Sequence, residues 1–241
     1  MYKTLISYLL MMSLSVSCQN IGGILKDKSK VLKKSPSAGL TNEEVINGLK
    51  EALAVGTNSA SSLAGRMDGF YKNPRLYIPW PPEAIAMKEK LMKLGFAAKI
   101  EEFELSLNRA AEEAALNASP VFADAIKKMT VQDGFAILKG ADTAATHYLR
   151  KTTYSPLKAQ FMPVVQAAIE KVSVTKYWNP LVNAYNMVPG VKKQNPDLDE
   201  YVTSRTINGL MLLISDEEVK IRNNPTARVT ALLKKVFGSK G

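Results

Sequence analysis

The sequence predicts an all-α protein, and two observations carry that prediction. Apolar residues recur at intervals of three and four over most of the chain after residue 41, as they do along one face of a helix. Sustained alternation of apolar and polar residues is missing apart from the short piece LYIPW, so strands are not expected. We therefore expect about ten helices in a single orthogonal or bundle-like domain, with one Pro-rich extended loop near residues 66–82.

The helical domain is expected to begin at Thr41 and to span residues 41–241. Thr41 and Glu44 form a Ser/Thr-x-x-Glu pair that caps a helix start, so the first helix should run from there to about Leu63. A second helix should start near Pro82 and stop at Gly95. The third has the clearest apolar seam, with spacings of three and four residues: Ile100, Phe103, Leu107, Ala110 and Ala114.

The later helices are expected to start at side chains that cap a first turn or next to a proline. The expected starts and ranges are Ser119, the segment from Thr130 to Asp133, Asp142, Ser155, and residues 174–187, 197–222 and 225–237. Pro163 should kink the helix that starts near Ser155, and Pro180 should interrupt the helix at 174–187.

Residues 1–18 have the anatomy of a secretory signal. Lys3 precedes an uncharged, mostly apolar run from Leu5 to Val16, which is shorter than the roughly 20 residues of a membrane-spanning helix. The segment resembles a bacterial lipoprotein signal, which implies that Cys18 is lipidated and that Gln19 directs the protein to the outer membrane. An ordinary signal peptide followed by a free Cys, and a cytoplasmic chain, are the alternatives.

Residues 19–40 are expected to be a Lys- and Ser-rich tether. Residues 18–41 hold five Lys against Asp27, a net charge of +4. Behind a lipid anchor these Lys would face anionic headgroups, each adding up to about 1 kcal/mol of attraction. We therefore expect a membrane partner, held through the lipid anchor and the basic tether, although a plain soluble linker has the same composition.

Composition excludes several classes of function. One Cys and one His cannot supply a disulfide framework or a zinc site with several such ligands, and we expect neither a metal nor another cofactor. Phosphate-binding glycine loops, dinucleotide fingerprints and Gly-x-Ser-x-Gly elbows are missing. Despite the net charge of +10, no RNP-like, KH-like or zinc-finger pattern occurs, so nucleic acid is not expected as a partner.

Two polar groups remain as candidates for chemistry. Glu104 and Glu112 flank the seam of the third helix, and paired carboxylates can serve acid–base catalysis; the alternative is a solvated face on which Arg109 pairs with Glu113. A second group begins at Asp142, where Thr143, Thr146 and Arg150 share one helix face and offer donors for an anion. There the alternative is that Asp142 merely caps the helix and Arg150 forms an ion pair.

Five separated stretches carry a resemblance to a known family: EEVINGLKEALAVGT (43–57), DGFYKNPRLYIPWP (68–81), FELSLNRAAEEA (103–114), GADTAATHYLRKTT (140–153) and RNNPTARVTALLKKVFG (222–238). Together they resemble the bacterial family called domain of unknown function 4197. The resemblance implies a helical, exported bacterial protein and no particular activity; His147 departs from the family pattern. If the stretches converge on one polar pocket, the candidate binding residues are Arg66, Asp68, Asn73, Asn108, Arg109, Asp142, Thr146 and Arg150.

The sequence favours a binding module over an enzyme. The leading interpretation is a lipid-anchored domain on the periplasmic side of the bacterial envelope that binds a small molecule, an envelope polymer or a protein partner. The alternative from another class is a cell-wall glycan hydrolase or lyase with Glu104 or Glu112 as general acid. A structural envelope protein without a pocket is the third possibility.

Overall fold

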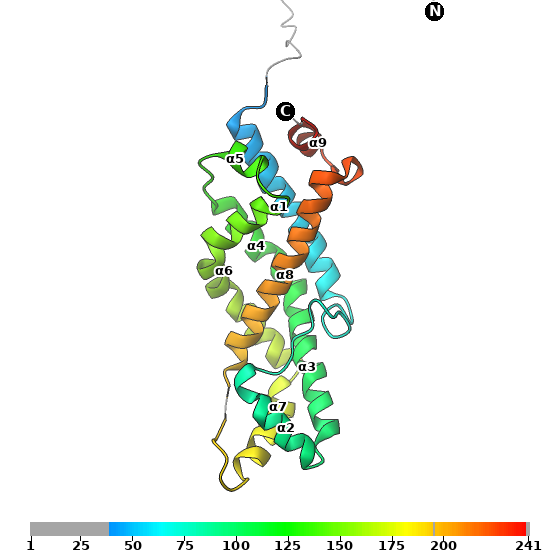
Figure 1. Ribbon diagram of the computed structural model, residues 1–241, viewed down its shortest axis with the longest axis vertical. Helices are drawn as coiled ribbons and strands as arrows, with labels where there is room; N and C mark the ends of the chain where they lie inside the picture. The colour runs from blue at the N-terminus through cyan, green and yellow to red at the C-terminus, as the bar shows by residue number, and fades with distance from the viewer. Residues whose placement is uncertain (1–38, 195, 240–241) are drawn as a thin grey trace, which may run out of the picture. The chain divides into compact units, whose positions relative to one another are not determined.

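The computed structural model of the chain describes residues 39–194 and 196–239. The expected signal peptide, Cys18 and nearly all of the expected tether lie outside these residues. From Leu40 on, the chain forms one unit of packed helices, as Figure 1 shows.

Most of the described residues are helical and none of them lies in a strand, which confirms the all-α prediction. Within them lie nine α-helices and two short 3-10 helices, close to the expected ten. The α-helices are α1 (Asn42–Gly65), α2 (Ile85–Lys93), α3 (Ala97–Leu116), α4 (Ala118–Lys128), α5 (Gly134–Leu138), α6 (Ala144–Lys171), α7 (Val174–Asn186), α8 (Leu198–Asn223) and α9 (Ala231–Gly238). The 3-10 helices are η1 (Pro82–Ala84) and η2 (Pro225–Ala227).

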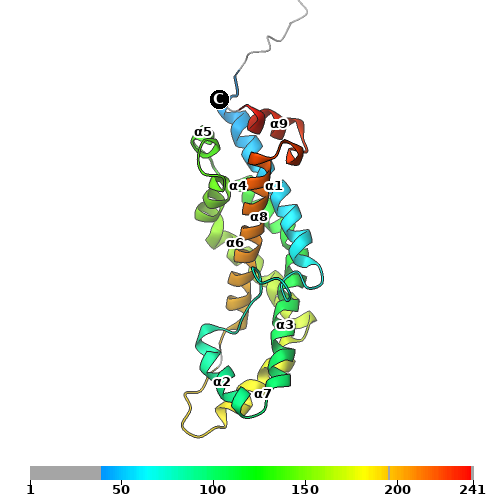
Figure 2. The same ribbon diagram turned by 45° about the vertical axis from the view of Figure 1, so that its right-hand side comes forward.

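Helices α1, α3, α6 and α8 pack against one another and enclose the apolar core. Helices α2 and α7 lie at one end of the domain, and α5 and α9 lie at the other, as both Figure 1 and Figure 2 show.

Two glycines of α1 let neighbouring helices approach it closely. A Cβ on Gly56 would lie 3.3 Å from the carbonyl oxygen of Ile214 in α8, and one on Gly48 would lie 2.6 Å from Val236 in α9.

Several helix starts are capped as the sequence predicts. The hydroxyl of Thr41 accepts a hydrogen bond from the Glu44 amide, and the Glu44 carboxylate accepts one from the Thr41 amide, both at 3.1 Å. Asp133 caps α5 by accepting the amide of Ala136, and Asp197 caps α8 by accepting the amide of Glu200. These contacts are local, so the sequence alone is enough to predict them.

Two expected caps are wrong. Ser119 lies inside α4, which starts at Ala118 directly after α3. Asp142 does not cap α6 either, because the carboxylate of Glu218 from α8 accepts the amides of Ala145 and Thr146, at 3.0 and 2.7 Å. A partner from a distant helix has taken the place of the local side chain.

The two helices expected at Asp142 and Ser155 are one helix, α6, which runs through both Pro156 and Pro163. Likewise α7 continues through Pro180. A proline removes one backbone hydrogen bond from a helix interior, but the packing of α6 outweighs that loss. Almost every turn of its inner face contributes a buried side chain: Leu149, Thr153, Leu157, Phe161 and Val165.

The last helix is shorter than the expected range of 225–237. Pro225 starts only the three residues of η2, and α9 begins at Ala231. The Thr230 hydroxyl caps α9 by accepting the amide of Leu233, so the true start carries a local signal of its own.

The Pro-rich loop at 66–82 is present as expected, but four of its apolar side chains belong to the core: Phe70, Leu76, Ile78 and Trp80. Ile78 and Trp80 are buried, and the Trp80 ring packs edge-on against Phe103 of α3, with 5.0 Å between ring centres. The turn that starts the loop holds Asp68 at a φ of 64°. The turn also brings Gly69 so close to α1 that a Cβ there would lie 2.3 Å from the carbonyl oxygen of Ala64.

Candidate functional site

A buried carboxylate on α3 fixes the start of the Pro-rich loop. Glu112 accepts the backbone amides of Phe70 and Tyr71 at 3.0 and 3.1 Å, and its other oxygen accepts Arg109 at 2.5 Å. Arg109 also donates to Asp68 at 2.7 Å. We call these five residues the loop latch. Every charged group in it has an opposite charge as a partner, so the loop latch serves to hold the loop against α3.

The expected pairing of Arg109 with Glu113 is wrong. Arg109 turns toward the loop, where its guanidinium meets Asp68 and also lies 5.8 Å from the ring centre of Tyr71. Glu113 instead pairs with Lys171 at the end of α6, at 2.8 Å. The loop decides the partner, because it brings a carboxylate to Arg109 from 41 residues away.

Asn108 and Asn73 also shape the loop. The buried Asn108 amide pairs with both backbone groups of Ile78: its Oδ1 accepts the amide at 2.8 Å, and its Nδ2 donates to the carbonyl at 3.0 Å. Asn73 accepts the amide of Arg75 at 3.1 Å within a turn. Arg66 is exposed at the end of α1. Five of the eight candidate residues therefore lie in or beside the loop, and all of these except Arg66 help to hold its conformation.

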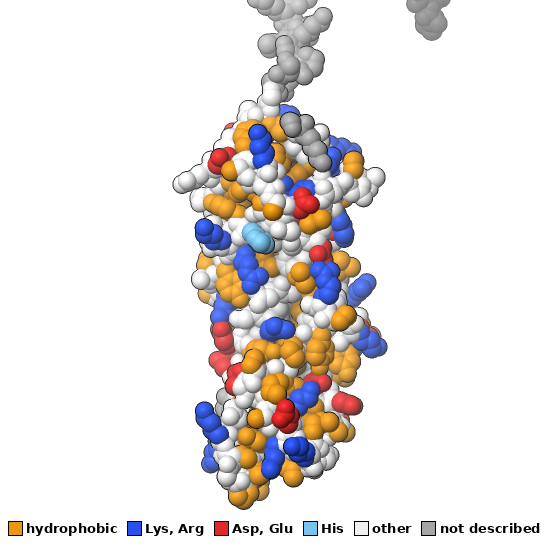
Figure 3. Space-filling view, viewed as in Figure 1, with side chains coloured by type: hydrophobic (Ala, Val, Ile, Leu, Met, Phe, Trp, Pro, Cys, Tyr) orange, Lys and Arg blue, Asp and Glu red, His pale blue; other side chains and the backbone are white. Residues whose placement is uncertain are grey.

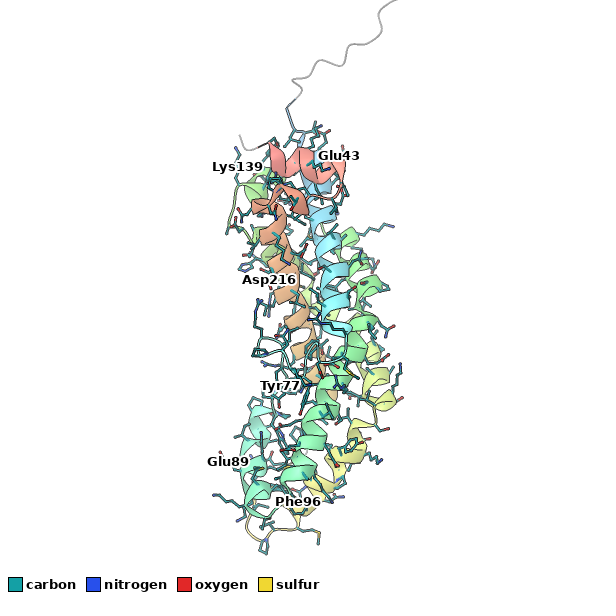
Figure 4. The ribbon with its side chains drawn as sticks, turned by 90° about the vertical axis from the view of Figure 1, so that its right-hand side faces the viewer. Glu43, Tyr77, Glu89, Phe96, Lys139 and Asp216 are labelled. Atoms are coloured by element: carbon teal, nitrogen blue, oxygen red, sulfur yellow. The ribbon has the colours of Figure 1, made fainter. Side chains whose placement is uncertain are left out.

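Glu104, the other carboxylate considered for catalysis, accepts two donors. The Tyr77 hydroxyl donates to its Oε2 at 2.9 Å, and the Lys88 ammonium pairs with its Oε1. Burial raises the pKa of Tyr77, and the hydrogen bond to Glu104 raises it further. In Figure 4, Tyr77 lies where the loop meets α3. Both oxygens of Glu104 are therefore occupied by this chain's own side chains.

A second buried carboxylate, that of Glu218, lies at the start of α6, close to the remaining candidate residues. Besides the amides of Ala145 and Thr146, it accepts the Thr146 hydroxyl at 2.7 Å and Arg222 Nε at 2.9 Å. The positive start of α6, where the sequence predicted donors for an anion, is thus filled by a carboxylate of the same chain. Sequence reasoning missed both Glu218 and Arg222; their four-residue spacing on α8 was the signal available.

Arg222 joins the ends of three helices. Its guanidinium donates to the carbonyl oxygens of Leu138 at 2.7 Å and Ile137 at 3.1 Å, which are at the end of α5. It also lies 5.6 Å from the ring centre of Phe237 in α9. The side chain is only 7% exposed, and its charge is matched by Glu218. Arg222 therefore sets the positions of α5 and α9 relative to the end of α8.

A cavity of about 680 Å³ opens between these three helix ends, and we call it the α5/α9 cavity. Cavities of some 300–1,000 Å³ are typical of small-molecule sites. Lys139, labelled in Figure 4, stands at this end of the domain, and Asp142 accepts the side-chain amide of Asn223 at 2.9 Å. The cavity is lined by Leu40, Phe135, Leu138, Lys139, Gly140, Asp142, Arg222, Asn223, Val236, Phe237 and Ser239.

The structure does not gather the eight candidate residues into one pocket. Those of the loop lie in and around the loop latch, and Asp142 lines the α5/α9 cavity. Arg150 donates to Asn208 at 2.5 Å and shares a small pocket of about 160 Å³ with Thr146 and the exposed His147.

Two kinds of feature do not occur among the described residues. None of the helices found there is both long and apolar enough to cross a membrane. Nor do His, Cys, Asp and Glu side chains in this part of the chain form a group of three or more that would suit a metal ion.

Comparison with known proteins decides the family. Residues 39–238 match the family model described as "Protein of unknown function (DUF4197)". The chain belongs to this family. No curated protein and no solved structure matches it. The DUF4197 match spans the loop latch, nearly all of the α5/α9 cavity and the contacts that we call the Glu218 network, formed by Glu218, Ala145, Thr146 and Arg222.

The stretches that carry the DUF4197 resemblance meet in two places. Stretches 68–81 and 103–114 are joined by the loop latch and Asn108. Stretches 140–153 and 222–238 meet at the α5/α9 cavity and supply six of its eleven lining residues. The stretch 43–57 packs against the cavity's α9 through Gly48.

Proposed function

We propose that this DUF4197 chain is a lipid-anchored protein of the bacterial envelope, on the periplasmic side of the outer membrane, whose helical domain binds a small anionic amphiphile. The α5/α9 cavity is the observation that carries the proposal. Its volume suits a small molecule, and it combines an apolar wall with a basic rim.

The lining supports both halves of such a ligand. Five apolar side chains from the domain start, α5 and α9 would contact a hydrocarbon tail: Leu40, Phe135, Leu138, Val236 and Phe237. At the rim, the exposed Lys139 forms no ion pair with any described residue, while Asp142 is bonded to Asn223. An acidic headgroup beside Lys139 would therefore find a charge that the described part of the domain leaves unmatched.

The envelope part of the proposal rests on the sequence before the domain. Cys18 follows an apolar signal, and the Lys-rich tether that comes next suits an anionic membrane surface. Labelling of growing cells with radioactive palmitate should mark the wild-type protein and leave a Cys18→Ser variant unlabelled. Labelling of both would contradict lipidation at Cys18.

The hydrolase alternative has less support from the geometry. One oxygen of Glu112 accepts the amides of Phe70 and Tyr71 and the other accepts Arg109, so both oxygens are engaged in holding the loop. Glu104 is bonded to Tyr77 and Lys88, and neither carboxylate lines the α5/α9 cavity. A purely structural protein, the third possibility, would leave the cavity without a role.

Two detergents with one tail and opposite headgroups test the binding proposal. Titration calorimetry would compare dodecyl phosphate with dodecyltrimethylammonium, both below micelle formation, on the unlipidated chain from Gln19 on. We expect the phosphate alone to bind with measurable heat. Lys139→Glu should weaken its binding about five- to tenfold, the effect of roughly 1 kcal/mol. Lys127→Glu changes another exposed lysine, on α4, and should leave binding unchanged.

A second variant tests the location. Ser239 is exposed and lines the cavity, so Ser239→Trp should fill part of it and reduce binding without disturbing the core. Equal binding of the two detergents, or full binding by Ser239→Trp, would reject an anionic amphiphile in this cavity. An unchanged thermal unfolding curve for each variant is the control for folding.

A further inference from the structure

The end of the domain opposite α5 and α9 consists of two turns. One joins α2 to α3, and the other follows α7; Figure 4 marks this end by Glu89 and Phe96. Gly95 and Gly190, at φ values of 84° and 80°, supply the left-handed conformation in the two turns. We call residues 89–99 and 183–194 the distal tip.

Apolar side chains are exposed on the distal tip. Met92 is 48% exposed, Leu94 is 50% exposed and Met187 is 83% exposed. Figure 3 shows hydrophobic and basic side chains next to one another at this end. Exposed apolar side chains that gather at one end of a domain are available to a partner.

The distal tip is also strongly basic. It holds five exposed lysines against the single acid Glu89, a net charge of +4: Lys90, Lys93, Lys99, Lys192 and Lys193. None of the five forms an ion pair with a described residue. Residues 42–239 as a whole carry 25 basic and 21 acidic side chains, also a net +4. The tip therefore accounts for the whole excess charge, and the rest of the domain is balanced.

We propose that the distal tip docks on an anionic lipid surface. Met92, Leu94 and Met187 would enter the boundary between headgroups and acyl chains, and the five lysines would contact the headgroup phosphates. Charge alone would equally suit an acidic polymer, but an acidic polymer would not bury the exposed apolar side chains, whereas the hydrocarbon layer behind anionic headgroups would. This site lies at the opposite end of the domain from the α5/α9 cavity and does not depend on it.

Vesicle binding tests the proposal on the unlipidated chain from Gln19 on. Its partition onto phosphatidylglycerol vesicles would be compared with that onto phosphatidylcholine vesicles. The basic tether adds to binding, but equally in all variants. A triple variant with Met92→Ser, Leu94→Ser and Met187→Ser should bind phosphatidylglycerol at least about tenfold more weakly. The matched control places serine at three exposed apolar residues where α1 and α3 end, away from the tip: Leu63, Met67 and Leu116.

A charge variant and a fluorescent variant complete the design. A second triple variant, with Lys93→Glu, Lys99→Glu and Lys193→Glu, should bind phosphatidylglycerol vesicles at least about tenfold more weakly. Added salt should abolish most of the difference in binding between the wild type and this variant. Leu94→Trp should shift its fluorescence to shorter wavelength on phosphatidylglycerol vesicles, and Leu116→Trp should not.

Three results would overturn the proposal. The first is equal binding by the triple serine variant and its control, and the second is an unshifted Leu94→Trp spectrum with bound vesicles. Both would mean that the tip does not enter the bilayer, and that charge alone, as for an acidic polymer, explains any binding. The third is a dimer that the triple serine variant abolishes while vesicle binding stays the same, because the tip would then bind a second copy of the chain.

Discussion

The loop latch and the Glu218 network share one arrangement of hydrogen bonds but hold different parts of the fold. In each, a buried glutamate accepts two consecutive backbone amides of a distant segment and an arginine of its own helix: Glu112 with Arg109, and Glu218 with Arg222. The loop latch holds a loop against the core. The Glu218 network holds helix ends around a cavity of about 680 Å³.

The difference lies in what each arginine faces. Arg109 meets a second carboxylate, Asp68, so the loop latch is complete without a ligand. Arg222 is satisfied by backbone carbonyls at the end of α5, a helix of only five residues. So short a helix covers little surface, and space remains beside it. Polar residues that satisfy one another thus mark structure, whereas a cavity whose rim lysine, Lys139, pairs with no acid in the described part of the chain is the better candidate for binding.

The largest effect is expected from Glu218→Ala. The change leaves Arg222, which is 7% exposed, without its carboxylate and removes the acceptor of two backbone amides. Loss of one partner of a buried ion pair costs about 3–5 kcal/mol, and we expect the upper part of that range in the free energy of unfolding. Urea denaturation would measure it. A loss below about 1 kcal/mol would show that the network does not hold the helix ends together.

Glu112→Ala should have the next largest effect, about 3 kcal/mol, because Arg109 is 27% exposed and retains Asp68 as a partner. The neighbouring substitution Glu113→Ala breaks only the exposed pair with Lys171 and should cost less than about 1 kcal/mol. Urea denaturation of both variants gives the comparison. Equal losses would mean that burial of the carboxylate does not add to its contribution to stability.

Local signals predicted much of this fold. The Thr41 and Glu44 pair, the apolar seam of α3 and the proline-rich loop each depend on neighbours within a few residues, and the sequence predicted each of them. Helix α6 was predicted as two helices, since Pro156 and Pro163 are strong local breakers and only packing against other helices overrides them.

The candidate site was less predictable, because its contacts join distant residues. Asn108 and Arg109 were proposed from the resemblance, but their partners in the structure belong to a loop 30 to 41 residues away in the chain. Glu218 reaches Ala145 across 73 residues, and no local pattern records that contact. A polar residue in a sequence does not reveal whether it will hold the fold or a ligand.

A smaller effect on the free energy of unfolding is expected from Gly48→Ala. This change tests whether α9, which forms part of the cavity wall, is held in place against α1. Alanine is favoured over glycine in a helix by about 1 kcal/mol, but its Cβ would lie 2.6 Å from Val236. We expect a net loss of about 1–2 kcal/mol in the free energy of unfolding and weaker binding of dodecyl phosphate, because α9 must move. Adding Val236→Ala should restore part of the clash-related loss. A stabilised single variant would show that α9 adapts freely.

The smallest effect should come from pH at the loop latch. The hydrogen bond from Lys72, followed by that from Arg109, holds the pKa of Asp68 below its ordinary value of 3.8. A carboxyl whose pKa is lowered by folding stabilises the folded state above that ordinary value, and the stabilisation is lost as the pH falls through the lowered pKa. Asn tolerates the left-handed backbone at this position, so Asp68→Asn removes the charge without adding strain. The difference in free energy of unfolding between wild type and variant should therefore be present near about pH 6 and shrink below about pH 4. A difference that stays constant over this range would mean that the Asp68 charge contributes nothing, and that Arg109 is held by Glu112 alone.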